Sequence, residues 1–437
     1  MAKLAELFRR LAFWILDQVR GGQIRRHLKE VRSCFGDPDS SEIAKRQERQ
    51  LRELLMHAAN RCEYYSAISS PSELSAFPVV NKSLIKSNRD KFMAEGFDPG
   101  KMHLVTTSGS TGTPFQVYQD KGKINRNYAD TLFYGGLAGF IVGYRLFYLK
   151  IWVEKKMLSK LAFWLRNIVP VDVIHLNDSE IESLLKKMER YRSGFSILAY
   201  ASALERICQY LDRKNSPPLK TRVRCIIAMS EALNEYTRTS MEKYFGMPVV
   251  SRYSNLENGI IAQQLRGGDS SFLINSASYH VEILKMDSDD PVNDSELGRI
   301  VLTDLFNYAM PLIRYDTGDI GAMEIRSGQC IRKHLTTVEG RKLDLLYDTK
   351  GHLISSFLVY KNMWQYPEIN QYQLVQESAT LYIFRINAEG TFNKEEQLVN
   401  EFKSFLGQDA DFRIDYVSEI PLLASGKRRK IVNNYIR

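Results

Sequence analysis

Apolar positions follow two periods along the middle of the chain. Short apolar runs of strand length alternate with amphipathic segments whose apolar positions recur at helical spacing. We expect strands at Phe147–Trp152, Ile197–Tyr200, Val223–Met229 and Pro248–Ser251, and helices at Ile181–Tyr191, Leu204–Leu211 and Asn234–Phe245. This alternation of strands and helices is typical of a layered α/β domain.

The pattern changes from Phe272 onward, where short strands dominate and indicate a β-rich subdomain. The strands expected there are Ser278–Leu284, Arg299–Thr303 and Ile320–Glu324. After them come further short strands and a helix near Lys394–Leu406. The fold class is therefore α/β, with a large N-terminal domain of layered sheets (1–340) and a small α+β C-terminal domain (341–437).

Residues 1–30 have the pattern of a basic amphipathic helix. Its apolar positions recur at helical spacing: Leu4, Leu7, Phe8, Leu11, Trp14, Ile15 and Val19. Basic residues lie among or just after them: Arg9, Arg10, Arg20, Arg25, Arg26 and Lys29. Such a helix either lies on an anionic membrane as a peripheral contact or docks on the protein's own core, which is the commoner arrangement. Both interpretations stay open, and residues 157–169 have a similar character.

Composition and charge narrow the class of protein. The 437 residues are 44% hydrophobic, which is ordinary for a globular protein with two cores. Five scattered cysteines form no CxxC pair, which argues against a zinc site and favours a reducing, cytoplasmic compartment. The net charge of +9 suits nucleic acid, an anionic membrane or anionic small molecules. Because no nucleic-acid-binding motif accompanies the charge, we expect no nucleic-acid partner.

A loop of hydroxyl, glycine and proline residues runs from Thr106 to Pro114. Backbone N–H groups and hydroxyls in such a loop can wrap a phosphate chain. The Gly-Lys-Ser/Thr of the usual P-loop is absent, so the loop carries no cation of its own. Taken alone, the loop is equally well interpreted as a surface linker.

Four later segments contain charged residues of candidate chemical value. They are Ser251–Gly259 with Glu257, Ile313–Gly321 with Asp316 and Asp319, Val338–Asp344 with Arg341, and Leu423–Lys430 with Lys427. Each has an ordinary interpretation when taken alone: a solvated loop carboxylate, a hairpin turn, an uninformative stretch and a basic tail. Glu257 nevertheless follows a short apolar strand, where α/β sheets bind ligands.

In this order the loop and the four segments resemble the adenylate-forming superfamily of acyl-CoA synthetases, adenylation domains and luciferases. The branch that the chain is most similar to is the phenylacetate–CoA ligase and CapK capsular-polysaccharide type. The resemblance runs from about residue 60 to the end and includes Ala199–Leu204 and Met229–Leu233.

The resemblance implies a role for each matched residue. The phosphate loop, which would grip the ATP phosphates, comprises Thr107, Ser108, Gly109, Ser110, Thr111, Gly112 and Thr113. Other nucleotide-site residues are Ser230 and Glu231, Tyr253 beside adenine, Asp319 on the ribose hydroxyls and Arg341 as a partner of that region. Glu257 would hold Mg²⁺, and Lys427 would be the catalytic lysine, with Lys430 as the competing choice. The small domain would be mobile, with a hinge near 341–344.

The resemblance also implies a reaction, which is the ATP- and Mg²⁺-dependent activation of a carboxylic acid to an acyl-adenylate, followed by transfer to CoA. The chain departs from the family at Leu343 and in Asp348–Leu353, a region that serves the CoA half-reaction. One alternative acceptor is therefore an amine or hydroxyl in capsule or cell-surface polysaccharide biosynthesis. An alternative of another class is a catalytically silent scaffold at the inner face of the membrane.

Overall fold

The computed structural model describes residues 2–36, 40–107, 115–152, 159–174, 176–326, 332–341, 346–354, 359, 362–363, 365–366, 368–388, 390, 392–421 and 428–435. Contacts divide these residues into two compact units. The first runs to residue 337, except for 318–321, which group with the second unit from residue 338 onward.

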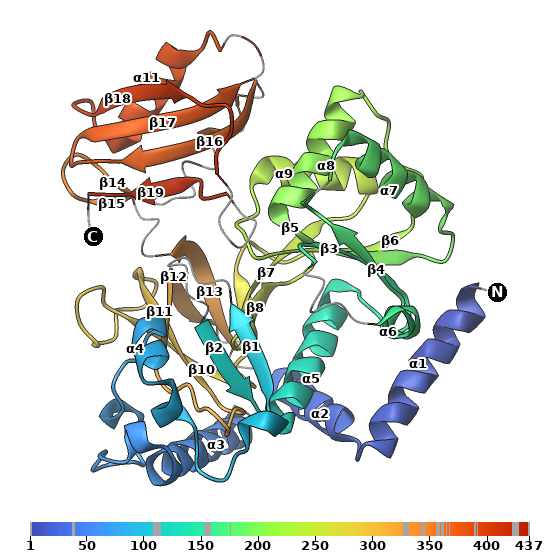
Figure 1. Cartoon of the computed structure of the whole chain (residues 1–437), viewed down its shortest axis with the longest axis vertical. Coiled ribbons are helices and arrows are strands. Elements are labelled where there is room, and N and C mark those ends of the chain that lie inside the picture. The colour runs from blue at the N-terminus through green and yellow to red at the C-terminus, as the bar shows by residue number, and fades with distance from the viewer. Residues whose placement is uncertain are drawn as a thin grey trace. The chain divides into compact units, whose positions relative to one another are not determined.

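An 11-stranded sheet, in the order β10-β11-β12-β13-β9-β8-β7-β6-β5-β3-β4, organises the first unit (Figure 1). Its strands, in that order, are Tyr279–Leu284, Gly298–Asp304, Tyr315–Arg326, Arg332–Arg341, Phe272–Ile274, Gly259–Gln264, Val249–Asn255, Val223–Met229, Phe195–Tyr200, Arg145–Lys150 and Ile168–Asp172. Strands β4, β3, β5, β6 and β7 are parallel, and β8 turns back antiparallel to β7.

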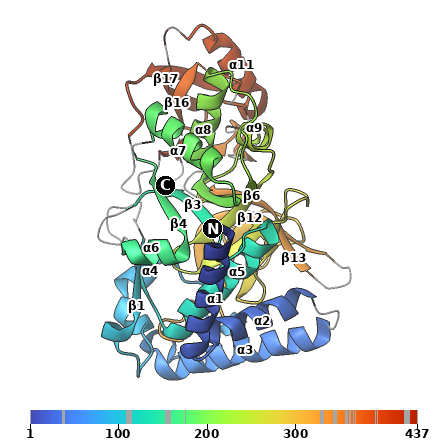
Figure 2. The same ribbon diagram turned by 90° about the vertical axis from the view of Figure 1, so that its right-hand side faces the viewer.

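Helices cover both faces of the parallel half (Figures 1 and 2). Helices α7 (Asp178–Arg190), α8 (Ala201–Arg213) and α9 (Glu235–Phe245) pack with β3, β5 and β6 in one buried core. The other face meets α5 (Lys121–Ala138), whose last residue packs with Cys225, Ile227 and Val250. This arrangement explains why these strands are continuous apolar runs, because both of their faces are buried. The predicted α/β class is confirmed.

Side-chain caps fix where three of these helices begin. Asp120, Asn177 and Asn234 each accept a hydrogen bond from a backbone N–H of the first turn of α5, α7 and α9. Capping of this kind satisfies N–H groups that have no partner within the helix.

The predicted hairpin turn around Asp316 and Asp319 is wrong. Residues 315–326 form one long strand, β12, that lies between β11 and β13 in the sheet. The Thr-Gly pair suggests a turn locally, but pairing on both sides keeps the segment extended. Gly318 absorbs the irregularity with φ +80°, a conformation that costs glycine little.

The second unit contains a four-stranded sheet in the order β18-β17-β16-β19. These strands are Asp411–Tyr416, Leu381–Ala388, Ile369–Gln376 and Ile431–Asn433. Helix α11 (Glu395–Leu406) contributes Leu398, Phe402 and Leu406 to the buried core of this unit. A short hairpin, β14 (Leu346–Tyr347) with β15 (Leu353–Ile354), lies in the same stretch of chain.

The remaining α-helices and strands of the first unit precede β3 in the sequence, except for α6, which connects β3 with β4. They are α1 (Ala2–Val19), α2 (Gln23–Gly36), α3 (Ser40–Arg61), α4 (Lys82–Ser87), the hairpin of β1 (His103–Thr107) with β2 (Phe115–Gln119), and α6 (Lys160–Arg166). Within the described residues, none of the helices has both the length and the apolar character that crossing a bilayer requires. The predicted single helix over residues 1–30 is wrong, because α1 ends at Val19 and α2 begins at Gln23, with Gly21 and Gly22 at positive φ between them. Most of the predicted apolar positions lie on α1 and are exposed, while Trp14 is half-buried.

A fully buried ion pair joins α5 to the antiparallel half of the sheet. Lys123 Nζ lies 2.7 Å from Asp304 Oδ2, and both side chains are wholly buried. The same ammonium donates a 3.0 Å hydrogen bond to the Tyr279 hydroxyl. Burial raises the pKa of Asp304, and the charge of Lys123 acts against that rise. Each charge therefore depends on the other for its place in the core.

Replacing Lys123 with Met should lower the free energy of unfolding by about 3–5 kcal/mol, because Asp304 is left as an uncompensated buried charge. Urea unfolding followed by circular dichroism measures the loss. Adding Asp304→Leu should recover much of it. The control is Lys101→Met, since Lys101 is a solvent-exposed partner of Asp98. A Lys123→Met protein as stable as the parent would contradict the assignment.

Candidate active site

The predicted site residues Ser230 and Tyr253 lie where the parallel strands end, as does Tyr200 of the segment Ala199–Leu204. Tyr200 is the last residue of β5, Ser230 follows β6 directly, and Tyr253 lies in the carboxyl-terminal half of β7. This edge of an open α/β sheet is where such folds bind ligands. Ser230 has φ +70°, an unusual conformation for a residue with a Cβ, and such strain is concentrated at functional sites.

Glu231 connects two of these strand ends. Its Oε2 accepts a 2.9 Å hydrogen bond from the backbone N–H of Ser202, in the first turn of α8. Tyr200 precedes that helix without capping it, so Glu231 supplies the cap from the neighbouring segment. Burial, and next the negative charge of Glu231, raise the pKa of Tyr200. The structure thus shows a local role for Glu231 besides the predicted contact with nucleotide.

Glu257 is the centre of the site. It lies in the turn between β7 and β8, and only 1% of the residue is exposed, so it is not a solvated loop carboxylate. The Tyr315 hydroxyl donates a 2.7 Å hydrogen bond to Oε1. The Lys82 ammonium lies 2.9 Å from the same oxygen. The side-chain amide of Gln119 donates to the backbone carbonyl of Glu257 at 2.8 Å. A buried carboxylate is thereby held in place with a cation on one oxygen.

Two backbone hydrogen bonds bring the Lys82 segment to the start of β12. Val80 N donates to the carbonyl of Arg314 at 3.0 Å, and Asp316 N donates to the carbonyl of Val80 at 2.8 Å. Asn81 then caps α4 by accepting from Leu84 N, so Lys82 begins the helix. Lys82 and Tyr315 therefore reach Glu257 from two segments that are fastened to each other.

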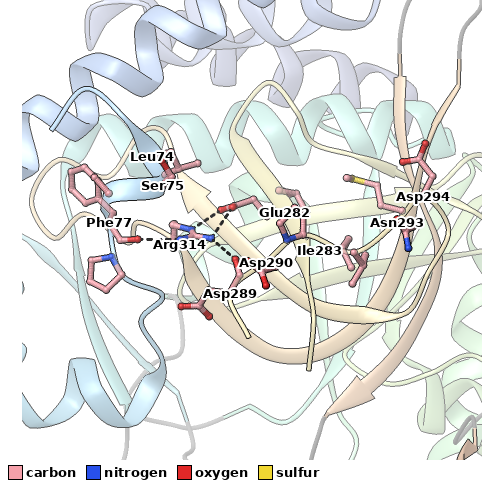
Figure 3. A pocket seen from close by; sticks show the side chains of 16 residues that line it. Leu74, Ser75, Phe77, Glu282, Ile283, Asp289, Asp290, Asn293, Asp294 and Arg314 are labelled. Carbon is pink, nitrogen blue, oxygen red and sulfur yellow. Dashed lines mark hydrogen bonds and ion pairs between the residues drawn. The ribbon is translucent and has the colours of Figure 1, made fainter. Parts of the chain in front are cut away.

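Arg314, which directly precedes Tyr315, contacts three neighbouring segments (Figure 3). Its guanidinium pairs with Glu282 at 3.2 Å and donates to the carbonyls of Phe77 and Asp289. Arg314 has φ +45°, a strained conformation for arginine that these contacts maintain. It forms part of the wall of a cavity of about 850 Å³, whose other walls include residues 74–78 and 289–294. The predicted site residues do not line this cavity.

The ends of the predicted phosphate loop lie beside the same centre. Thr107 and Phe115 are paired residues of the β1–β2 hairpin, so the loop between them begins and ends at neighbouring points. The Phe115 ring stacks parallel to that of Tyr315, with centroids 6.2 Å apart. Lys82 Nζ lies 5.8 Å from the centre of the Phe115 ring. The loop therefore starts and finishes next to the groups that hold Glu257.

Tyr253 meets the β12 segment that carries the predicted ribose carboxylate. Its hydroxyl donates to Thr317 Oγ1 at 3.3 Å, two residues before Asp319. Asp319 itself is half-buried in β12. Its neighbour Asp316 lies 3.0 Å from Arg299, so it has a structural partner in the sheet.

Several predicted residues lie outside the part of the chain that the structure describes. They are the loop residues Ser108, Gly109, Ser110, Thr111, Gly112 and Thr113, and the lysine Lys427. The backbone of Arg341 ends β13, while its side chain is not described, and most of the predicted hinge at 341–344 falls among undescribed residues. The roles of these residues, and the hinge, stay predictions.

Lys82 and Tyr315 were not predicted as site residues from the sequence. Tyr315 lies within the Ile313–Gly321 segment, and its position directly before Asp316 could have indicated it as a site residue. Lys82 ends an extended Pro-Val-Val-Asn-Lys segment, and nothing local connects it with Glu257. Two further residues, Tyr148 and Arg252, lie on the same face of the sheet as Tyr200. Burial raises the pKa of Tyr148 to about 12 and lowers that of Arg252 to about 10.

The described residues fit a magnesium ion that is shared with a nucleotide rather than a cage made by protein alone. Within the described ranges, no group of three or more His, Cys, Asp or Glu residues could hold a metal. Mg²⁺ in nucleotide enzymes is commonly bound through one or two carboxylates together with phosphate oxygens. Glu257 would be such a carboxylate, and its pairing with Lys82 shows that the position accommodates a positive charge.

Comparison of the sequence with known proteins identifies relatives. Residues 346–434 match the family model of the CapK C-terminal domain. Protein CapK of Staphylococcus aureus is 22% identical over 437 aligned residues, which cover 93% of this chain and 91% of CapK. Phenylacetate-coenzyme A ligase of Aromatoleum evansii is 20% identical over 279 aligned residues, or 60% of this chain and 62% of that enzyme.

Comparison with solved structures identifies the fold. A 2-hydroxyisobutyryl-CoA ligase in the postadenylation state, in complex with R3-HIB-AMP, superposes with a TM-score of 0.70 at 12% identity, covering 90% of each chain. ATP-bound MatB of Rhodopseudomonas palustris gives a TM-score of 0.58 at 13% identity, covering 77% of this chain and 68% of MatB. The predicted resemblance to CapK and to phenylacetate–CoA ligase is confirmed as similarity in sequence, and the fold is that of the CoA ligase above.

Removing the charge of Glu257 should destabilise the protein, because Lys82 and Tyr315 lose their shared acceptor. We expect Glu257→Gln to lower the free energy of unfolding by about 1–3 kcal/mol. Lys82→Met should cost less, about 1 kcal/mol or below, because the Lys82 side chain is partly exposed. Urea unfolding of both single variants and the double variant gives the coupling energy.

The matched control for that cycle is Glu48→Gln with Arg52→Met, an exposed ion pair on α3. Its coupling energy should be smaller than that of the Glu257–Lys82 pair. Equal coupling energies in the two cycles would show that Lys82 and Glu257 are not held together as described.

Proposed function

We propose that the protein activates a carboxylic acid with ATP and Mg²⁺. The proposal is supported by the match of residues 346–434 to the CapK C-terminal domain and by the similarity of the fold to adenylate-forming ligases. The product of the first step is an acyl-adenylate with release of pyrophosphate, and the acyl group then passes to CoA. The observation that carries this proposal is the buried Glu257 carboxylate, held by Lys82 and Tyr315 at the edge of the sheet where the phosphate loop begins and ends.

The chemistry of this reaction suits the groups present. A carboxylate is already nucleophilic, so the enzyme must mainly position it and compensate charge at the α-phosphate. Glu257 would hold Mg²⁺, which when bound offsets the charge of the phosphate oxygens. Lys82 is a further cation beside the loop ends, and Arg252 supplies a buried positive charge on the face that carries Tyr148 and Tyr200. No enzyme nucleophile is needed.

The remaining nucleotide contacts are proposed from the matched positions. Thr107 to Thr113 would grip the phosphates, while Ser230, Glu231 and Tyr253 would line the adenine side. Asp319 and Arg341 would bind the ribose region. From the small domain, Lys427 would reach the substrate carboxylate after residues 341–437 rotate about the hinge near 341–344.

An amine or hydroxyl acceptor in cell-surface polysaccharide biosynthesis is the second candidate. The similarity to CapK covers 93% of the chain, whereas that to the phenylacetate-coenzyme A ligase covers 60%. The departing segment Asp348–Leu353 is a tight hairpin turn, in which Asp348 accepts hydrogen bonds from the backbone N–H of Lys350 and His352. Such an acceptor would place a cytoplasmic enzyme at the inner face of the membrane.

Carboxylate-dependent exchange of labelled pyrophosphate into ATP tests the first half-reaction without assuming an acceptor. We expect exchange with at least one member of a panel of aryl, fatty, hydroxy and amino acids. Product analysis with CoA or with amine and hydroxyl acceptors then separates the two candidates. Nucleotide binding with no exchange across the panel would favour the catalytically silent scaffold instead.

Lys427→Ala should lower the exchange rate by about 10²–10³-fold while leaving ATP binding nearly unchanged, because the lysine acts on charge that develops in the transition state. Initial rates and a thermal-shift titration with ATP measure the two effects. The matched control is Lys430→Ala, since Lys430 packs against the Tyr372 ring within the small sheet. Parent-like exchange in Lys427→Ala, or an equal loss in Lys430→Ala, would remove Lys427 from the proposed role.

A further inference from the structure

Helix α1 is attached to the protein through its charged side. Both of its carboxylates, Glu6 and Asp17, are buried. Glu6 accepts hydrogen bonds from the Tyr191 hydroxyl at 2.6 Å and from Ser193 Oγ at 2.5 Å. Asp17 accepts from the backbone N–H of Ile24 and so caps α2. This is the reverse of an ordinary amphipathic helix, which buries its apolar stripe.

Close backbone packing fixes that orientation. Gly143 has φ +93°, and a Cβ at this position would lie only 2.6 Å from the carbonyl oxygen of Glu6 and 2.9 Å from Arg10 N. Only glycine therefore allows the approach of α1. Rolling the helix to bury its apolar side would expose this contact and remove both hydrogen bonds of Glu6, so the orientation is built into the fold.

The opposite side of α1 presents large apolar side chains to solvent. The exposed residues, with exposed fractions from 48% to 79%, are Leu4, Leu7, Phe8, Leu11, Ile15, Leu16 and Val19. Most of these positions are three or four residues apart and form one stripe along the helix. Contiguous apolar surface of this extent marks an interaction site in a soluble protein.

Helix α6 adds to this surface from a distant part of the sequence. Arg9 Nε donates to the carbonyl of Trp164 at 3.0 Å, and its guanidinium lies 4.8 Å from the centre of the Trp164 ring. Figures 1 and 2 show the two helices near each other at the margin of the first unit. Besides Trp164, α6 exposes Leu161 and Leu165. We call these exposed apolar residues of both helices the α1–α6 surface.

The charges around the α1–α6 surface are of one sign. Between residues 3 and 19, whose exposure the structure describes, every exposed charged residue of α1 is basic. The exposed basic residues of α1, its C-terminal end, α2 and α6 are Lys3, Arg10, Arg20, Arg25, Arg26, Lys29, Arg32 and Arg166. An apolar stripe with a basic border complements a surface that is apolar inside and anionic outside.

We propose that the α1–α6 surface docks the protein on an anionic lipid bilayer. Helix α1 lies in the membrane plane with its apolar side chains among the acyl chains. Trp164 sits at the level of the headgroups, and the basic border contacts anionic lipids. This inference does not depend on the proposed ligase function, because it rests on residues outside the candidate active site.

Co-flotation with vesicles tests the docking of the full-length protein. The probes are vesicles of phosphatidylglycerol with phosphatidylcholine, and vesicles of phosphatidylcholine alone. We expect binding to the anionic vesicles that weakens as salt is added, since salt screens the basic border. Trp fluorescence should shift to the blue on binding, and Trp164→Phe should reduce that shift.

Substitutions locate the binding surface. Leu11→Glu should weaken vesicle affinity at least about tenfold, because it removes an apolar side chain that would insert among the acyl chains and adds a charge of the wrong sign. Arg10→Glu should weaken it about fivefold or more, since each basic residue near an anionic surface contributes about 1 kcal/mol. The matched controls, Ile325→Glu and Lys220→Glu, change exposed residues elsewhere and should bind like the parent.

Three results would overturn the proposal. The first is a parent protein that does not float with anionic vesicles at low salt. The second is Leu11→Glu binding as tightly as its control. The third is self-association, measured by light scattering, that Leu11→Glu abolishes while vesicle binding persists, which would assign the surface to a second copy. Circular dichroism verifies that each variant is folded, and pyrophosphate exchange reports separately on the proposed function.

Discussion

The arrangement of the candidate site depends on keeping one carboxylate buried. Glu257 is almost completely removed from water, and an ionised carboxylate is tolerated there only if charge and hydrogen bonds compensate it. The compensation comes from Lys82 and Tyr315, which belong to different parts of the chain. Their positions in turn depend on Arg314, whose guanidinium ties residue 77 to β10. Arg314, Lys82 and Glu257 therefore depend on one another for their positions.

The fold could largely be predicted from the sequence where burial is simple. The strand Val223–Met229 was located to the residue, because a strand covered by helices on both faces is a continuous apolar run. The later part of β12 was predicted as the strand Ile320–Glu324, whereas its first residues were interpreted as a turn, since Asp316, Gly318 and Asp319 have the composition of a turn. Its extended form is imposed by the neighbouring strands β11 and β13. Pairing with strands that are remote in sequence therefore overrides the local preference of these residues for a turn.

The site was predictable to the extent that its motifs are local. Glu257 could be found from the residues around it, whereas its partner Lys82 could not, because only the folded chain brings them together. The same limit applies to α1. Helical spacing predicts that the helix exists, but not which side faces inward. That choice is made by Tyr191 and Ser193, which offer hydroxyls to Glu6.

The β1–β2 hairpin has a consequence for the polymer physics of the loop it carries. Thr107 and Phe115 are opposite one another in an antiparallel ladder, where paired Cα atoms lie about 5 Å apart. Strand pairing therefore holds the two ends of the intervening segment together. Contacts within the segment do not have to offset the entropy that is lost when its ends are closed. Since closure entropy grows only logarithmically with length, adding a few residues to this segment should have little effect on the stability of the domain. The hairpin therefore allows the predicted phosphate loop to vary in length without loss of the fold.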